Sequence, residues 1–229
     1  MTDAHCHVTG GDPSVREFLI GRDFIGVHPW ECLGGLEGLG GLEGLESWLR
    51  DKLTNPNLPN SEAPNLLPGV GEIGLDRLRT REIPPQMREV FEAQLKLAFE
   101  FNRPVVLHGA KCWGQVVKTI QTFKTSQTSQ TFLFHGFSRS DGLIPDIVAL
   151  GGYISVGPAV LNDHAVNYRE LVKKIPIERL LLETDRTPEN AAECPSVAEV
   201  AAETAKLRGM TVGELERLTD ENAERFRYR

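Results

Sequence analysis

The sequence predicts an α/β fold, a β/α barrel built from parallel strands. Three observations predict it: short apolar runs alternate with amphipathic stretches, several runs are continuously apolar, and polar side chains recur where the runs end. Continuous runs such as PVVLH, TFLFH and RLLLE are typical of parallel strands that are buried on both faces. Their alternation with helical patterns implies a parallel sheet.

Seven segments have the pattern of strands. In chain order they are Ala4 to Val8, Asp23 to His28, Leu67 to Ile73, Pro104 to His108, Thr131 to His135, Gly152 to Val156 and Arg179 to Glu183. Between them, Pro84 to Phe101 places apolar side chains near one face and charges opposite, as an amphipathic helix does. Ser196 with Glu199, and Thr211 with Glu214, are capping boxes that predict the starts of the last two helices.

The connecting segments carry signals of their own. Asp12-Pro13 predicts a helix start, with Asp12 as N-cap and proline at the first helical position. The glycine-rich stretch Gly34 to Leu45 predicts a loop that leads into a helix near Trp48. Asn55 to Pro68 and Lys124 to Gln130 predict polar surface connections. Because the strand–helix pattern resumes after each, we expect a single domain over residues 1–229.

Composition limits the classes of function. The net charge of −7 and pI of about 5.4 argue against a protein that coats nucleic acid, although an enzyme that grips one strand end remains compatible. The four cysteines are widely spaced and form no C-x-x-C pair, which favours reduced thiols in a cytosol. We find no signal peptide and no apolar run of membrane-spanning length, so we expect a cytoplasmic protein. Nothing in the sequence predicts a protein partner.

Five of the six histidines lie at or just after the end of a predicted strand. Parallel β/α folds place their active sites at that end. His5 and His7 are two residues apart on one strand, so both imidazoles point to the same face and can reach one ion. Further potential ligands follow at the ends of later strands: Glu72, His108, His135 and Asp185. Each alone could be a hydrogen-bonded polar group, but six in this order predict a metal centre.

This ligand set suits two divalent ions. Imidazole and carboxylate are ligands for such cations, and the Glu72 carboxylate can bridge two of them. We expect His5 and His7 on one ion, and His108 and His135 on the other. Two ions about 3.5–4 Å apart can activate a water and stabilise a leaving oxygen.

The motifs DAHCHV, GVHPW, GEIGLD, PVVLHGAKCW, FLFHGFS and LLLETDRTP, in this order over residues 3 to about 188, resemble those of the TatD family within the amidohydrolase-like superfamily. The resemblance implies a TIM-type barrel that hydrolyses phosphodiester bonds in DNA, often from the 3′ end. It implies two divalent ions (Mg, Mn or Zn) on His5, His7, Glu72, His108, His135 and Asp185. It also gives Asp185 and Glu72 catalytic roles, with Asp185 orienting the attacking water.

The chain departs from the family pattern in several places. About twenty residues separate His7 from His28, where the family usually has a further strand and helix. We therefore expect a barrel reduced to seven strands, with a gap or a widened pair between the first two. The family commonly has HPH at His28-Pro29-Trp30, and an arginine where this chain has Ala110 followed by Lys111. It often has ETDAP where this chain continues with Arg186 after Asp185. These changes affect substrate contacts and leave every expected ligand in place.

Basic residues closely follow the predicted ligands. These are Arg77 (with Arg79 and Arg81 after it), Lys111, Arg139 and Arg186. On an acidic protein, such a local basic rim would hold substrate phosphates. His28 is a further candidate for contact with phosphate, or for support of the ligands from behind.

The sequence thus predicts a divalent-metal hydrolase of DNA phosphodiesters, acting on strand ends or nucleotides. A first alternative is hydrolysis of a small ester, lactone or amide by the same metals, for which a basic rim is unnecessary. A second alternative is a catalytically decayed barrel that only binds ligands, against which the intact ligand set argues.

Overall fold

The computed structural model describes residues 1–34, 36–55, 67–78, 80–125 and 129–228. Within these ranges eight strands form two parallel sheets, β1–β2 and β3 to β8 in chain order. The strands are β1 (Thr2–Cys6), β2 (Arg16–Leu19), β3 (Phe24–Ile25), β4 (Gly69–Asp76), β5 (Val105–Ala110), β6 (Phe132–Phe134), β7 (Gly152–Val156) and β8 (Leu180–Leu182).

Backbone contacts join the two sheets into a barrel. The Asp185 amide donates to the His5 carbonyl at 3.0 Å, and the His7 amide donates to the Arg186 carbonyl at 2.7 Å, which links β8 to β1. A parallel bridge between Ile20 and Phe24 links β2 to β3. The predicted β/α barrel is therefore confirmed.

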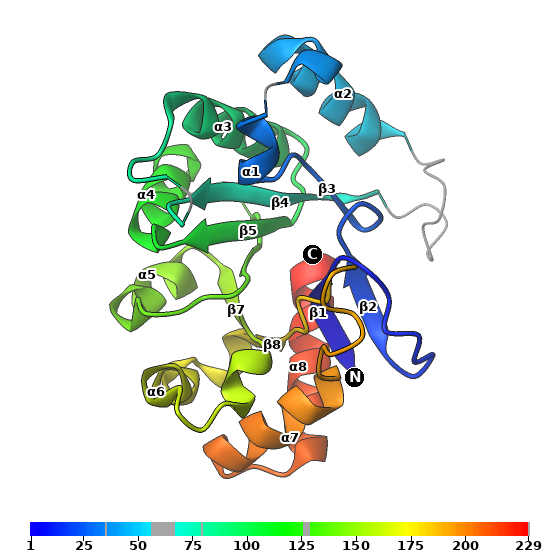
Figure 1. The fold of residues 1–229 in the computed structure, drawn as a ribbon, viewed down its shortest axis with the longest axis vertical. Helices are drawn as coiled ribbons and strands as arrows, with labels where there is room; N and C mark the ends of the chain where they lie inside the picture. The colour runs from blue at the N-terminus through cyan, green and yellow to red at the C-terminus, as the bar shows by residue number, and fades with distance from the viewer. Residues whose placement is uncertain (35, 56–66, 79, 126–128, 229) are drawn as a thin grey trace.

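Helices surround this ring (Figure 1). They are α1 (Pro29–Cys32), α2 (Gly41–Thr54), α3 (Pro85–Glu100), α4 (Trp113–Phe123), α5 (Ile144–Ala149), α6 (Val166–Lys174), α7 (Val197–Arg208) and α8 (Val212–Arg227). Single 3₁₀ turns occur at Glu37–Leu39, Asp141–Leu143, Pro158–Leu161 and Ile177–Arg179. The two predicted capping boxes are present at the starts of α7 and α8. No helix in the described ranges is long and apolar enough to cross a membrane.

The predicted count of seven strands is wrong, because the described chain has eight. The additional strand is β2, which lies where Asp12-Pro13 predicted a helix. Asp12 instead closes a turn: its Oδ1 accepts from the Ser14 amide at 2.9 Å, and its carbonyl accepts from the Val15 amide at 3.1 Å. The barrel is reduced in its helices and not in its strands, because neither the β1–β2 nor the β2–β3 connection contains a helix.

The glycine-rich segment is more helical than predicted. Helix α2 starts at Gly41, within the stretch assigned to a loop, and a 3₁₀ turn precedes it. Gly40 and Gly41 have φ of 78° and 80°, the left-handed region that glycine adopts readily. A Cβ on Gly44 would lie 1.6 Å from the Leu39 carbonyl oxygen, so the 3₁₀ turn can pack on α2 only where a glycine stands. Of the two predicted surface connections, residues 56–66 and 126–128 lie outside the described ranges.

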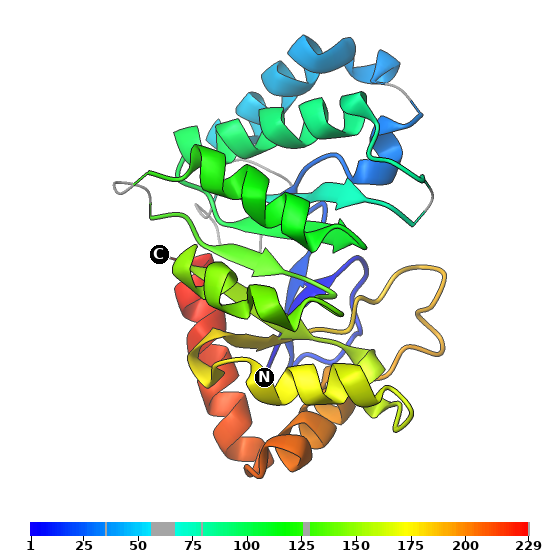
Figure 2. The ribbon, with the colours of Figure 1, turned by 90° about the vertical axis from the view of Figure 1, so that its left-hand side faces the viewer.

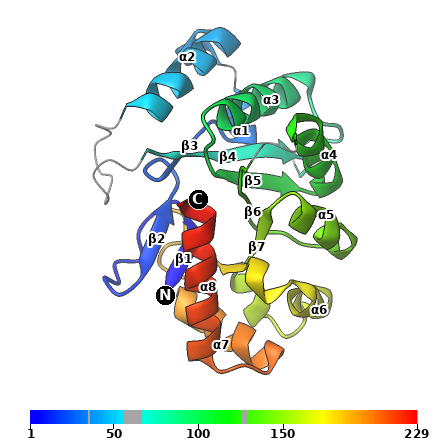
Figure 3. The same ribbon diagram turned by 180° about the vertical axis from the view of Figure 1, so that it is seen from behind.

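Helix α8 covers the end of the barrel where the strands begin (Figure 2). It lies beside β1 and β8 and packs against α7 (Figure 3). Its Asn222 side chain donates to the Leu180 carbonyl at the start of β8, and the Phe226 carbonyl accepts from the Thr131 hydroxyl just before β6. The Phe226 ring enters an inner apolar cluster with Phe18, Phe24 and Tyr153. The opposite end, where the strands finish, stays available for a site.

Candidate metal centre

Strand alternation directs the candidate ligands into the barrel. Val106 and Leu133 belong to the inner cluster, so the side chains two residues later, His108 and His135, point to the same inner side. On β4, Ile73 and Leu75 pack outward against the helices, which leaves Glu72 facing inward. The apolar pattern of each strand therefore fixes both the core and the direction of its ligand.

One oxygen of Glu72 faces the ligands of the first strand. Its Oε2 lies 3.5 Å from His5 Nε2 and 3.3 Å from His7 Nε2. The same two nitrogens lie 3.4 and 3.7 Å from Asp185 Oδ1. His5, His7, Glu72 and Asp185 thus form one group of donors, named here the first group.

The other oxygen of Glu72 faces a second group. Its Oε1 lies 2.6 Å from His108 Nδ1 and 2.7 Å from His135 Nε2. His28 also belongs to this group, because its Nε2 lies 3.4 Å from both Glu72 Oε1 and His108 Nδ1. His108, His135 and His28 thus surround the same oxygen of Glu72, while His135 also lies near His5 and Asp185, so the pairing of histidines on two ions stays a prediction.

The electrostatics of the centre depend on burial and on Glu72. Burial opposes the charge of Glu72, but His135, His108 and His28 outweigh it and hold the pKa of this carboxyl well below its usual range. Burial also opposes the charge of His135, yet the Glu72 carboxylate raises its pKa to about 10. His5 is fully buried, and this burial lowers its pKa to about 4. The centre therefore combines charged carboxylates with imidazoles of very different basicity.

The donors fit divalent metal ions. His5 Nε2 is buried and has no hydrogen-bond partner among the described residues, although it faces two carboxylates. A buried imidazole nitrogen left without a partner is unfavourable unless a ligand satisfies it. Three sets of donor atoms lie within 4.8 Å of one another: His5, His7 and Glu72; His28, Glu72 and His108; and His5, His135 and Asp185. Imidazole nitrogens with carboxylate oxygens suit Zn²⁺ and Mn²⁺, and the carboxylates suit Mg²⁺.

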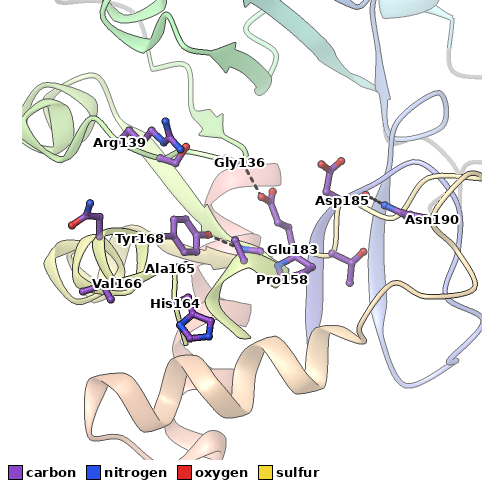
Figure 4. A pocket seen from close by; sticks show the side chains of 15 residues that line it. Gly136, Arg139, Pro158, His164, Ala165, Val166, Tyr168, Glu183, Asp185 and Asn190 are labelled. Carbon is purple, nitrogen blue, oxygen red and sulfur yellow. Dashed lines mark hydrogen bonds between the residues drawn. The ribbon is translucent and has the colours of Figure 1, made fainter. Parts of the chain in front are cut away.

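Asp185 is held in a constrained backbone conformation at the edge of the centre. Its φ is 52°, in the left-handed region that non-glycine residues seldom adopt. The hydrogen bond from its amide to His5 fixes the backbone, and Asn190 Nδ2 donates to its carbonyl at 3.2 Å (Figure 4). Its side chain is 47% exposed, so the carboxylate faces both the donors and solvent.

Three buried carboxyl groups support the ligands, and the sequence analysis gave them no role. Asp76 Oδ2 accepts from His108 Nε2 at 2.8 Å, on the far side of the ring from Glu72. Glu183 accepts from the Gly136 amide at 2.8 Å and the Ser155 hydroxyl at 2.6 Å, and burial raises its pKa to about 7. Asp3 accepts from the Thr184 amide and hydroxyl, which ties β1 to the segment before Asp185. The sequence did carry a signal for two of them, because residues two or four positions apart on a strand point to the same face. Asp76 lies four residues after Glu72, and Asp3 lies two residues before His5.

Three cavities surround the centre. The Asp185 cavity, of about 880 Å³, is lined by Asp185, Glu183 and Tyr168 among others (Figure 4). The Lys111 cavity, of about 820 Å³, shares Gly136, Ser138 and Arg139 with it, so the two adjoin. The Trp48 cavity, of about 450 Å³, reaches His7, His28 and Glu72 from another side.

The structure brings together three of the four candidate rim cations. Arg77, Lys111 and Arg139 all line the Lys111 cavity, and no acidic residue is among the described residues that line it. Lys111 and Arg139 both have φ of 58°, in the left-handed region; Lys111 directly follows β5, and Arg139 lies five residues after the end of β6. Arg186 lies apart from them: its guanidinium donates to the Cys194 carbonyl at 3.4 Å, and it lines none of the three cavities. Arg79 lies outside the described ranges.

Comparisons with known proteins agree with this geometry. The metal-dependent hydrolase YabD of Bacillus subtilis is 32% identical over 164 residues, which are 69% of this chain and 64% of YabD. A metal-dependent hydrolase of Haemophilus influenzae is 36% identical over 120 residues, 51% of this chain and 45% of that protein. The 3′-5′ ssDNA/RNA exonuclease TatD of Erwinia tasmaniensis is 29% identical over 178 residues, 72% of this chain and 68% of that protein. The chain thus spans less than two thirds of the first two relatives.

Solved structures and a family model give the same assignment. YjjV, a TatD homologue from Escherichia coli, superposes with a TM-score of 0.67 at 25% identity, over 95% of this chain and 78% of YjjV. A TatD-family hydrolase from Entamoeba histolytica shares the fold, with a TM-score of 0.69 at 16% identity over 93% of this chain and 75% of that one. The family model described as TatD related DNase matches residues 21–227. The chain therefore belongs to the TatD-related DNase family.

Proposed function

We propose that this protein is a divalent-metal-dependent hydrolase that removes nucleotides from the 3′ end of single-stranded DNA. One observation carries the proposal: the two oxygens of Glu72 face separate groups of nitrogen and oxygen donors, next to a cavity lined by cations. A phosphodiester needs both features, since its reacting phosphorus requires charge stabilisation and the neighbouring phosphates require cations.

The chain supplies distinct groups for each part of the reaction. Both donor groups would hold one divalent ion each, and such ions act as Lewis acids that acidify a water and stabilise the leaving oxygen. We assign Asp185 the role of accepting the proton of the attacking water, because its carboxylate is half exposed beside the donors and its lowered pKa keeps it ionised. Arg77, Lys111 and Arg139 would hold phosphates of the strand in the Lys111 cavity.

The direction of cleavage is supported by relatives. Two of them, from Erwinia tasmaniensis and Edwardsiella piscicida, are named 3′-5′ ssDNA/RNA exonucleases and are 29% and 28% identical to this chain. For this chain, attack of water on the last phosphodiester would form a new P–O bond and break the bond to the 3′ oxygen. That oxygen would gain a proton, and a 5′-mononucleotide would be released.

A labelled single strand tests this function. The protein is assayed for metal content and then incubated, with Mg²⁺, Mn²⁺ or Zn²⁺, with DNA labelled at its 5′ end. We expect a ladder that shortens from the 3′ end, and none with Glu72→Gln. Glu89→Gln, an exposed position on α3, serves as the matched control and should behave like the native protein. Intact DNA alongside rapid turnover of a neutral ester or lactone would instead favour a small-molecule hydrolase.

A further inference from the structure

We propose that the Trp48 cavity is a subsite for the terminal nucleoside, the unit that is released when its 5′ phosphate lies at the metal centre. The inference rests on the proposed function and extends it to a cavity in which motif residues meet Trp48 and Lys52, two residues outside the sequence motifs. Position, size, chemistry and local architecture each support it.

The position of the cavity separates it from the path of the strand. His7, His28 and Glu72 line the Trp48 cavity, and none of the three lines the Asp185 or Lys111 cavity among the described residues. The Trp48 cavity therefore reaches the donors through different residues from the Asp185 cavity, which contains Asp185 and adjoins the Lys111 cavity. A phosphodiester bound at the donors links two nucleosides, and a separate cavity is available for each side.

The volumes of the cavities suit different lengths of nucleic acid. The Trp48 cavity measures about 450 Å³, near the lower end of the roughly 300–1,000 Å³ typical of small-molecule pockets. The Asp185 and Lys111 cavities measure about 880 and 820 Å³ and share part of their lining. A single nucleoside suits the first, whereas several linked nucleotides suit the pair.

The walls of the Trp48 cavity suit a base better than a phosphate chain. Trp48 on α2 offers a half-buried indole, and Ile20 and Ile25 contribute apolar surface. Lys52 lies four residues after Trp48 on the same helix face and also lines the cavity, where its ammonium can donate to acceptor atoms of a base. Aromatic side chains that stack on bases bind them with little regard to sequence.

The cavity exists because the β2–β3 connection is a short turn instead of a helix. Gly21 and Arg22 form this turn, and a Cβ on Gly21 would meet open space. Arg22 is anchored to the Asp23 carboxylate and the Glu17 carbonyl at 2.7 Å each, so this side of the cavity is fixed. A helix at this place would lie against α2 and fill the space.

Direct binding measurements test the subsite without depending on DNA cleavage. The metal-loaded protein is titrated calorimetrically with dAMP and with 2-deoxyribose 5-phosphate, which differ only in the base. We expect dAMP to bind about tenfold more tightly, the order of effect that one stacked base contributes. Trp48→Leu, which keeps the apolar packing, should remove this difference, and Trp48→Phe should restore most of it.

The control variant lies in the Lys111 cavity. Lys111→Ala should leave dAMP binding unchanged while it weakens binding of a six-nucleotide strand. Equal binding of dAMP and deoxyribose phosphate by the native protein would overturn the subsite, as would a base preference that Lys111→Ala abolishes and Trp48→Leu does not. A base preference that depends on Trp48 in a protein that cleaves no DNA would support the subsite while rejecting the proposed function.

Discussion

Among single residues, Glu72 has the central position because it contacts both groups of donors. Its carboxylate is buried, and three imidazoles surround one of its oxygens while two approach the other. A buried carboxylate is tolerated only where charge or hydrogen bonds compensate for lost hydration. This explains why the pKa values of His108 and His135 are raised despite their burial, and it has a measurable consequence for metal binding.

We expect metal binding to release protons at pH 7. Without metal, Glu72 raises the pKa of His135 to about 10, so this imidazole is protonated at neutral pH. A metal ion binds only the neutral ring, so its binding must displace that proton. Affinity should therefore rise with pH, by about tenfold per unit for each proton released, up to the pKa of His135. Calorimetry in two buffers of different ionisation enthalpy measures the release, and identical heats in both would contradict it.

We expect Asp185→Asn to lower turnover far more than it weakens substrate binding. The change is nearly isosteric and keeps the backbone contacts of residue 185, but it removes the carboxylate that we propose accepts the water proton. Loss of one general base typically costs about 10²- to 10⁴-fold in rate. The measurement is kcat and KM with a labelled strand, together with metal content, and Asp163→Asn on an exposed loop is the control. Near-native turnover would remove Asp185 from the mechanism.

Among the elements, α8 has a role that its sequence does not reveal. Its capping box predicts only where the helix starts, whereas the structure shows that its last turn covers the starts of the strands. Phe226 is fully buried there among aromatic rings, and the neighbouring Arg227 donates to the Leu67 carbonyl just before β4. The apolar interior is thus sealed at the end opposite the metal centre.

We expect Phe226→Ala to reduce the free energy of unfolding by about 3–5 kcal/mol, because it opens a cavity in a well-packed cluster. Chemical denaturation of the metal-free protein measures this loss. Tyr228→Ala, two residues later and largely exposed, should change stability by less than about 1 kcal/mol. Metal content of the folded Phe226→Ala protein should stay native, since the donors lie at the other end. A loss below 1 kcal/mol would show that α8 does not seal the barrel.

The elements also show where sequence reasoning succeeds and fails. Apolar runs identified seven of the eight described strands, and the six candidate ligands were expected at or near strand ends. β2 was missed because Arg16–Leu19 is short, half charged and preceded by a signal that helices and turns share. The start of α2 was missed because glycine weakens helix propensity. The glycine at position 44 is explained by the close approach of the Leu39 carbonyl, which leaves no space for a Cβ. The position of Arg186 depends on its contact with Cys194, a tertiary detail that no local pattern contains.

For the whole molecule, the distribution of charge matters more than its sum. A net charge of −7 repels nucleic acid at a distance, yet the described lining of the Lys111 cavity has three cations and no carboxylate. A strand can therefore be held where the field is locally reversed, and only over the few phosphates that reach this cavity. Such an arrangement favours strand ends over long duplexes.

We expect the affinity for single-stranded DNA to depend weakly on salt. If Arg77, Lys111 and Arg139 each neutralise one phosphate, the logarithm of the binding constant should fall with the logarithm of salt concentration with a slope of about −2. Lys111→Glu and Arg139→Glu should each raise KM for DNA, make the slope shallower and leave metal content native. Lys118→Glu, exposed on α4 outside the cavity, makes the same charge change and should alter KM little. A steep slope that neither cavity variant changes would place the nucleic-acid contacts on another face. The reason is that the salt slope is proportional to the number of phosphates neutralised anywhere on the protein.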